Sequence, residues 1–174
     1  MTGSRDIITI QRIRPEEGLV LRELRLRSLA DSPSAFGQDP HEAMARPANE
    51  WHRSALQSSH GQSRTWLLAR RGDDPIGLVQ GRRRHPSTLL LFSMWVEPES
   101  RRLGVGERLI SELEAWAWRW QASETVLWVL HRNHPALDFY RELGFDVLET
   151  GVDAEAGTRY GALAMRRAIG APAG

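Results

Sequence analysis

One glycine-containing stretch, residues 94–107, has the residue types of an anion-binding site. An apolar segment ends at Val96, a polar loop with two adjacent arginines follows, and Gly104 and Gly106 then open an amphipathic segment. The first N–H groups of a helix lack a partner inside the helix, and the helix dipole adds about half a positive charge there. Glycine also lets a phosphate approach the backbone closely. The stretch therefore predicts a site that fits a pyrophosphate.

Three interpretations of this stretch compete. It could be an ordinary loop before a helix that begins with glycine. It could open a dinucleotide-binding unit, but Leu109 stands where the third glycine of G-x-G-x-x-G belongs, and Glu124 precedes the next strand instead of ending it. A Walker A loop would need Gly-Lys-Ser/Thr, which this stretch lacks.

A second segment, residues 133–145, combines helix signals with two polar side chains. Pro135 suits the first turn of a helix, and Gly144 suits its C-terminal cap. Asn133 can cap the N-terminus of this helix. Tyr140 shares one helical face with apolar residues, which is also the pattern of a tyrosine that only packs.

Taken together, the two segments resemble the GNAT family of N-acetyltransferases. Arg101-x-x-Gly104-x-Gly106, directly after a strand that ends in Val-x-Pro, matches the R/Q-x-x-G-x-G/A motif with which the family binds acetyl-coenzyme A. Residues 133–145 are similar to the family's N-x-x-A-x-x-x-Y-x-x-x-G-F segment. The likeness is close over residues 89–150 and rests on the order of elements elsewhere. It implies a primary amine as acyl acceptor, either a small molecule or a peptide.

The resemblance implies acetyl-coenzyme A as the acyl donor and no metal ion. Backbone groups of Met94, Trp95 and Val96 would pair with its pantetheine arm. Asn133 matches a position that hydrogen-bonds the cofactor, with helix capping as its alternative. The loop amides would hold the pyrophosphate, and they belong to Arg101, Arg102, Leu103, Gly104, Val105, Gly106 and Glu107.

Tyr140 matches the family's general acid, which protonates the departing thiolate. Unperturbed tyrosine and thiol pKa values are about 10 and about 8.5, so the transfer would be uphill by roughly 1.5 units. A hydrogen bond to the developing thiolate would already help. We expect the amine to attack the thioester directly, with no covalent enzyme intermediate, while a backbone N–H near Val96 polarises the carbonyl oxygen.

The attacking amine must be neutral, so a base is needed. Glu97, just past the fourth strand, and His131, just past the fifth, are the candidates, and solvated loop residues or a water chain are the alternatives. Trp128 stands where N-terminal acetyltransferases of the ribosomal type often carry a glutamate, which argues against that substrate class. The missing glutamate leaves a second function open, an acetyl-coenzyme A-binding sensor or regulatory module without catalysis.

Two further groups of polar residues lie outside the motifs. Asp39, His41 and Glu42 fall in the variable region that forms the acceptor cleft in the family, where they could bind a cationic amine. Residues 82–85 read Arg-Arg-Arg-His and could contact a phosphate or an acidic substrate. Because charge runs usually face water, we interpret this second group as a solvated hairpin turn.

Hydrophobic periodicity predicts the elements that must position these residues. Strands are expected at residues 7–13, 65–70, 76–81, 89–96, 125–130, 145–149 and 159–165. Helices are expected from residue 15 to about residue 30, as one or two short pieces within 40–57, and at 105–120 and 135–143. The order of elements predicts an α+β fold with one mixed sheet flanked by helices. The resemblance makes that sheet seven-stranded and mostly antiparallel.

Composition limits the remaining possibilities. With 174 residues, 41% of them hydrophobic and 26% charged, the chain is expected to form one domain over residues 1–170, followed by a disordered tail at 171–174. It has no cysteine, which excludes disulfides, thiolate metal sites and a cysteine nucleophile. A net charge of +1 gives no sign of nucleic-acid binding. The lack of a signal peptide or apolar span predicts a cytoplasmic protein away from membranes, and the resemblance allows a homodimer.

Overall fold

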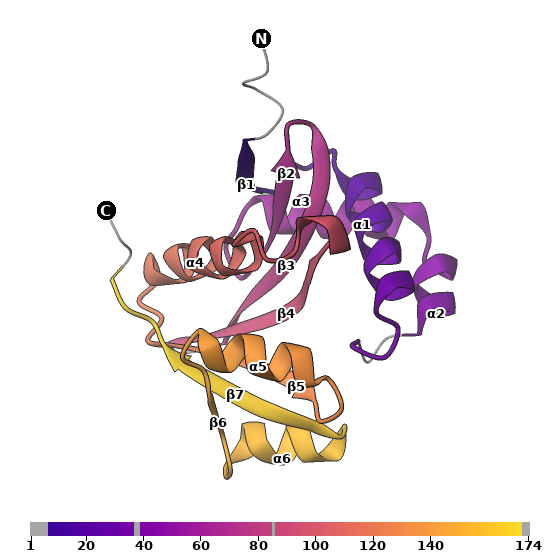
Figure 1. The fold of residues 1–174 in the computed structure, drawn as a ribbon. Coiled ribbons are helices and arrows are strands. Elements are labelled where there is room, and N and C mark those ends of the chain that lie inside the picture. Colours follow the sequence, from indigo (N-terminus) through magenta and orange to yellow (C-terminus); the bar gives the residue numbers. More distant parts are fainter. Residues whose placement is uncertain (1–6, 37–38, 85, 172–174) are drawn as a thin grey trace.

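The structure is a computed structural model that describes residues 7–36, 39–84 and 86–171. In this part of the chain, seven strands form one mixed sheet. The strands are β1 (Ile8–Arg12), β2 (Arg64–Arg71), β3 (Asp74–Arg84), β4 (Thr88–Val96), β5 (Glu124–Leu130), β6 (Asp146–Val147) and β7 (Ala162–Ala168). Their order across the sheet is β1-β2-β3-β4-β5-β7-β6 (Figure 1). The helices are α1 (Gly18–Asp31), α2 (Pro40–Ala45), α3 (Ala48–Ser59), α4 (Val105–Trp118), α5 (His134–Glu142) and α6 (Val152–Arg159), with a 3-10 turn η1 at Pro98–Ser100. The predicted fold class is confirmed.

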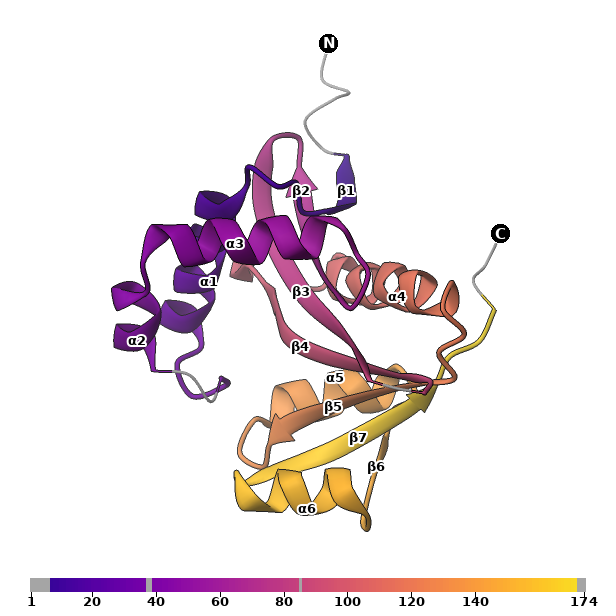
Figure 2. The same cartoon turned by 180° about the vertical axis from the view of Figure 1, so that it is seen from behind.

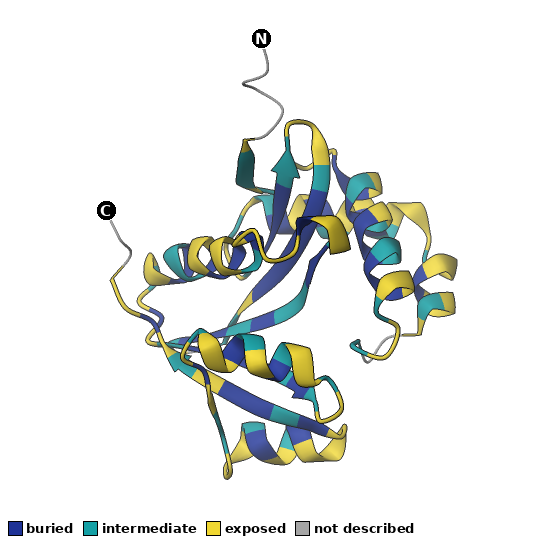
Figure 3. Ribbon diagram, viewed as in Figure 1, coloured by how far each residue is buried: buried dark blue, intermediate teal, exposed yellow. Residues whose placement is uncertain are grey.

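Side chains alternate between the two faces of the sheet, and each face has its own apolar core. In β2, Leu67 and Ala69 belong to the core beneath α4 and α5, whereas Trp66 and Leu68 belong to the core beneath α1 and α3. Figures 1 and 2 show these two pairs of helices on opposite sides of the sheet. In Figure 3, buried residues run along the strands and exposed residues lie on the outer surfaces of the helices.

The pairing of β4 with β5 is parallel and short, whereas the other neighbouring strands pair antiparallel. Its register runs from Thr88 opposite Glu124 to Leu90 opposite Val126 and ends there. Beyond this point the two strands diverge (Figure 1). Because β5 stays paired with β7 along its length, the sheet opens at its centre and remains joined on either side.

A β-bulge in β4 lies just past the point where the strands part. The partners of β4 in β3 change from Gln80 opposite Phe92 to Leu78 opposite Trp95, so two residues of β4 face one residue of β3. One of the two, Ser93, has a positive φ of 53°, which is uncommon for residues other than glycine. A bulge bends its strand and changes the direction of nearby side chains. Here it lies on the strand that borders the opening.

The antiparallel pairing of the last predicted hairpin is confirmed, because β6 pairs with β7, but the predicted turn between the two strands is wrong. Residues 152–159 form helix α6 where the sequence predicted a turn, and β6 has two residues. Contacts distant in sequence hold this helix. Arg84 of β3 donates to the Asp153 carboxylate at 2.6 and 2.8 Å, and Trp128 of β5 donates from Nε1 to the Asp153 backbone oxygen at 2.9 Å. Local periodicity does not report such contacts, and this is why the helix was missed.

The predicted turn at residues 82–85 is also wrong over its described part, whereas the predicted exposure to solvent is confirmed for Arg82. The first three of these residues belong to β3, while His85 lies outside the described residues. Arg82 and Arg83 lie over aromatic rings, with centroid distances of 5.0 and 4.9 Å. Cation–π contacts of this kind let arginines occupy a strand that neighbours a core.

The structure bears in part on two predictions, the disordered tail at residues 171–174 and the lack of a membrane span. Ala171 is described and lies outside helices and strands, while residues 172–174 of the predicted tail lie outside the described residues. Among the residues that the structure describes, no helix is long and apolar enough to cross a membrane.

A substitution at Gly81 of β3 tests how closely α4 packs against the sheet. A Cβ placed at Gly81 would lie 2.6 Å from Leu113 Cδ1 and 3.0 Å from Trp116 Cζ3, both on α4. Gly81→Val should therefore lower the free energy of unfolding by about 1–3 kcal/mol, the usual cost of overpacking a core. Gly170→Val is the matched control, because a Cβ there meets nothing within 4 Å. Urea unfolding measures both, and equal midpoints for the two variants would contradict the close contact.

Candidate active site

Two hollows meet at the opening between β4 and β5. We call the larger one, with a volume of about 1140 Å³, the main cleft, and the smaller one, of about 320 Å³, the inner pocket. The main cleft borders the end of β4, residues 101, 102 and 104–107, α5, and residues 31–36 at and after the end of α1. The inner pocket lies between β4 and β5 and reaches Arg25 in the middle of α1. The two hollows adjoin, since both are lined by Ala35, Phe36, Met94, Asn133, Ala136 and Tyr140.

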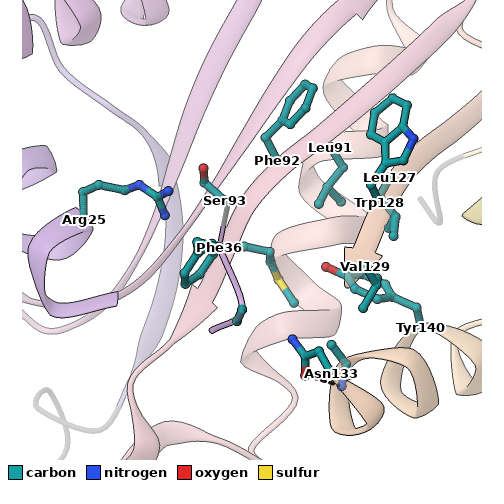
Figure 4. A pocket seen from close by; sticks show the side chains of 13 residues that line it. Arg25, Phe36, Leu91, Phe92, Ser93, Leu127, Trp128, Val129, Asn133 and Tyr140 are labelled. Atoms are coloured by element: carbon teal, nitrogen blue, oxygen red, sulfur yellow. Dashed lines mark hydrogen bonds between the residues drawn. The ribbon is translucent and has the colours of Figure 1, made fainter. Parts of the chain in front are cut away.

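The inner pocket begins where the pairing of β4 with β5 ends. Directly after the last paired residues, 91–94 of β4 and 127–129 of β5 line the pocket. Phe92 and Trp128 stack at its wall with ring centroids 5.9 Å apart (Figure 4). Past the last pair, the backbone groups of β4 have no partner in β5, so a ligand or water must satisfy those that point into the opening. This edge of β4 can therefore bind an extended ligand that carries amide groups.

The loop before α4 and the first turn of that helix form one wall of the main cleft. The lining includes Arg101, Arg102 and residues 104–107. Arg102 and Gly104 have positive φ angles of 63° and 74°, and α4 begins directly after Gly104. Successive N–H groups in such a turn, followed by the free N–H groups of a helix start, form a concave site for anions. Leu103 was predicted with this group, but it is 57% exposed and does not line the cleft.

Gly106 has a packing role in addition to any contact with a ligand. A Cβ at this position would lie 3.0 Å from Phe139 Cζ and 3.3 Å from Met94 Cε. The absence of a side chain therefore lets the start of α4 lie against α5 and β4 at once. The sequence analysis considered only the approach of a phosphate.

Arg101 holds the end of β4 against α1. Its Nε donates to the Val96 backbone oxygen at 2.9 Å, and its Nη2 donates to the Asp31 carboxylate. Trp95 Nε1 donates to the same carboxylate at 2.9 Å. Burial by itself would raise the pKa of Asp31, but hydrogen bonds from Trp95, Ser32 and Arg101 outweigh burial and lower it. The guanidinium of Arg101 thus fixes the shape of the cleft wall.

Tyr140 lies where the two hollows join. It is 7% exposed, and its ring contacts Phe139 and Phe145 with centroids 5.2 and 5.5 Å away. Figure 4 shows its hydroxyl directed into the space between β4 and β5. Burial raises the pKa of Tyr140 above the ordinary value of about 10, so the hydroxyl stays protonated at neutral pH. The side chain packs in the core and presents a hydrogen-bond donor to the pocket.

Asn133 caps α5, as one of its two interpretations predicted. Its Oδ1 accepts a hydrogen bond from the Ala136 backbone N–H at 3.3 Å. Asn133 also lines both hollows, and Figure 4 shows its amide nitrogen directed away from the helix. Capping therefore occupies the oxygen and leaves the amide N–H groups on the side of the hollow.

Neither predicted base lies where the hollows join. The Glu97 carboxylate accepts hydrogen bonds from Arg27 Nη2 and Ser100 Oγ, each at 2.7 Å. His131 is exposed in the loop after β5. Neither residue is part of the described lining of either hollow, so the geometry gives these two assignments no support and they stay predictions from the sequence. A position just past a strand does not determine the direction of a side chain, and Glu97 turns toward arginines of the neighbouring elements.

The acidic residues of the variable region are also placed elsewhere. Asp39 caps α2 by accepting the His41 backbone N–H at 2.8 Å, and neither of these residues nor Glu42 is part of the described lining of the hollows. The sequence analysis missed Arg25, which is 6% exposed and lines the inner pocket from α1. Its spacing of four from the buried Leu21 was the available signal, because such residues share one face of a helix.

The chain matches a family model described as the acetyltransferase (GNAT) family, over residues 25–145. All of the catalytic and donor-binding residues predicted from the sequence fall inside this range. No curated protein matches the sequence.

Several solved structures are similar to this chain over nearly its whole length. The PaiA N-acetyltransferase from Thermoplasma acidophilum, in complex with coenzyme A, has a TM-score of 0.76 and 19% identity, covering 93% of this chain and 99% of that one. A GNAT acetyltransferase from Streptococcus pneumoniae has a TM-score of 0.73 and 20% identity, covering 94% and 100%. One from Staphylococcus aureus has a TM-score of 0.74 and 17% identity, covering 94% and 100%. At these identities, the likeness shows a shared fold.

The protonation state of Tyr140 can be measured directly, because the chain has two tyrosines. Tyr160 is 74% exposed, so Tyr160→Phe should be tolerated and leaves Tyr140 as the remaining tyrosine. Burial should then keep tyrosinate absorbance near 295 nm absent up to about pH 11, where a tyrosine with the ordinary pKa of about 10 is mostly ionised. Ionisation near pH 10 in the folded variant, checked by circular dichroism, would show that the Tyr140 hydroxyl is solvated.

Proposed function

The chain belongs to the acetyltransferase (GNAT) family, and from this premise we propose that it transfers the acetyl group of acetyl-coenzyme A directly to a primary amine. The family match confirms the family and the acyltransferase class that the two motifs predicted. The coenzyme A in one of the similar structures supports the choice of donor. The proposed acceptor is a small molecule or a peptide, while a cytoplasmic location and a homodimer stay predictions from the sequence.

The observation that carries this proposal is that the two hollows adjoin and that Tyr140 lines both of them. A two-substrate transfer needs separate space for donor and acceptor, and a point at which their reacting atoms meet. One wall of the main cleft offers backbone amides and arginines to the phosphates of a long donor, whereas the inner pocket is smaller and is lined by several apolar and aromatic side chains. We therefore place the donor in the main cleft and the acceptor amine in the inner pocket.

The residues of the main cleft fit acetyl-coenzyme A. N–H groups of residues 104–107, together with Arg102 and Arg132, would hold the pyrophosphate. Met94 and Trp95 lie on the edge of β4 past its pairing with β5, where backbone groups can pair with the amides of a pantetheine arm. The Val96 backbone oxygen already accepts from Arg101, so Val96 would contribute through its N–H or its side chain.

Tyr140 would act at the departing sulfur. The amine nitrogen forms a bond to the carbonyl carbon, the carbon–sulfur bond breaks, and the sulfur leaves with the electron pair of that bond. The nitrogen loses one proton to water, and water returns a proton to Tyr140 after Tyr140 has protonated the sulfur. Because burial raises the pKa of Tyr140, complete proton transfer is more uphill than unperturbed pKa values suggest. Tyr140 therefore acts first as a hydrogen-bond donor to the developing thiolate. Its proton can follow because the same buried surroundings make the thiolate more basic.

The described lining of the inner pocket contains no aspartate, glutamate or histidine. The acceptor would then arrive as a neutral amine or lose its proton to water. The same observation favours a second candidate function, an acetyl-coenzyme A-binding sensor without catalysis. A panel of amines separates the two, because an enzyme releases free thiol with at least one amine, whereas a sensor binds the donor and releases none.

Donor binding should appear as a shift of the thermal unfolding midpoint. A ligand at 100 times its dissociation constant stabilises a protein by about 2.7 kcal/mol. With roughly 2–4 °C per kcal/mol for this chain length, acetyl-coenzyme A should raise the midpoint by roughly 5–10 °C. NADH serves as the control, since the dinucleotide interpretation of the glycine loop predicts the opposite preference. A rise with NADH alone, or with neither ligand, would contradict the proposed donor site.

Replacing Tyr140 tests its role in the transfer. Tyr140→Phe should lower kcat by about 10²-fold, as expected when a positioned acid or hydrogen-bond donor is lost. The dissociation constant for acetyl-coenzyme A should change little, because the ring and its packing remain. Tyr160→Phe is the matched control, since Tyr160 is exposed and lines neither hollow. An unchanged kcat in Tyr140→Phe would remove Tyr140 from the mechanism.

A further inference from the structure

Arg25 is the charged residue in the described lining of the inner pocket. It lies on the buried face of α1, between the buried residues Leu24 and Ser28. Its Nη1 donates to Ser28 Oγ at 3.3 Å, and its guanidinium lies 4.5 Å from the centroid of the Phe36 ring. Figure 4 shows the side chain reaching from α1 toward Phe36 and Ser93. The helix, the serine and the ring thus hold a positive charge at the wall of the pocket.

The buried position of the Arg25 guanidinium favours an anionic ligand. Burial lowers the pKa of Arg25 to about 10, which leaves the side chain protonated at neutral pH but poorly hydrated. A guanidinium has five N–H donors in a planar fork that matches the two oxygens of a carboxylate. A charge removed from water gains more from such a partner than a solvated charge does.

The rest of the inner pocket limits what the anion can be attached to. Its described walls include Leu91, Phe92, Leu127 and Trp128, all of them apolar or aromatic. Without a carboxylate in that lining, a second positive charge on the acceptor would face Arg25 without compensation. The volume of about 320 Å³ is at the lower end for ligand sites, which suits a molecule of amino-acid size.

We propose that the acceptor is a small amine that also bears a carboxylate and an apolar or aromatic group, and that Arg25 binds the carboxylate. This inference rests on the proposed function, because it concerns the amine that receives the acetyl group. The apolar group would lie against Phe92 and Trp128, and the amine would point toward Tyr140. Polyamines and other acceptors with several positive charges are disfavoured by the same arrangement.

Matched pairs of amines test this proposal on the unaltered protein. Phenylalanine is compared with 2-phenylethylamine, and leucine with 3-methylbutylamine, so that the members of each pair differ by the carboxylate. Calorimetry in the presence of coenzyme A measures binding, and free thiol released from acetyl-coenzyme A measures turnover. We expect the carboxylate member of at least one pair to bind about 10- to 100-fold more tightly, the range for a charge-assisted hydrogen bond.

Substitution of Arg25 assigns that preference to one side chain. Arg25→Gln should remove most of the difference within a pair, and Arg25→Lys should keep part of it, because the charge remains and the fork is lost. Arg22→Gln is the matched control on α1, since Arg22 lines neither hollow. The midpoint shift with acetyl-coenzyme A checks that each variant is folded and still binds the donor.

The outcomes separate this inference from the proposed function. No midpoint shift with acetyl-coenzyme A in the unaltered protein would overturn the proposed function, and this inference with it. A normal shift together with equal or tighter binding of the amines that lack a carboxylate would overturn this inference alone. A preference that persists in a folded Arg25→Gln variant would also overturn it, because the carboxylate would then bind elsewhere.

Discussion

The hydrogen-bonded ladder between β4 and β5 ends at Leu90 and Val126, and the position of that end governs the shape of the site. β3 holds β4 on one side and β7 holds β5 on the other, so each half of the sheet stays paired while the centre opens. Backbone groups inside a protein need hydrogen-bond partners, and those past the end of the ladder border a hollow. Capacity for a ligand thus follows from incomplete pairing, and the bulge at Ser93 directs the edge that a ligand would meet.

Because the centre of the sheet is open, contacts at its borders must keep the two halves in register. Arg167 of β7 donates to both oxygens of Glu114 on α4, at 3.2 and 2.6 Å, and to the Leu143 backbone oxygen at 2.7 Å. Arg84 of β3 makes its paired hydrogen bonds to Asp153 on α6. The pairs with Glu114 and Asp153 each join a strand of one half of the sheet to a helix of the other half. The planar fork of arginine suits such bidentate pairs better than the ammonium of lysine, which this chain lacks.

The two hollows differ in the side chains that line them, and this difference favours a different ligand in each. The main cleft has a helix start and a glycine turn in one wall, which favour the anionic group of a long ligand at that wall, whereas the rest of its lining carries charges of both signs. The inner pocket combines apolar and aromatic walls with the buried cation Arg25, which favours a small ligand with one negative charge. Tyr140, kept neutral by burial, stands between them and offers a hydrogen bond at the place where negative charge would develop on sulfur. In surroundings of low polarity, such a donor is worth more than it is in water.

The sequence by itself determined the family, the fold class and the wall of the main cleft, because each depends on residues that are close together in the chain. A helix start with its glycines is contiguous, so the sequence predicted residues 101–107 together, with Leu103 as the exception that the structure places outside the lining. The same holds for the α5 segment, where the spacing from Asn133 to Tyr140 is fixed by helical geometry.

The tertiary structure alone decided the inner pocket, because its wall is assembled from α1, β4, β5 and α5, which are far apart in sequence. Sequence periodicity placed Glu97 and His131 at strand ends but could not give the direction of their side chains, and ion pairing turned Glu97 elsewhere. It likewise could not show that Arg25 would face a hollow instead of solvent. That outcome depends on where the β4–β5 ladder ends, and the end of a ladder is a property of two strands together and not of either sequence segment.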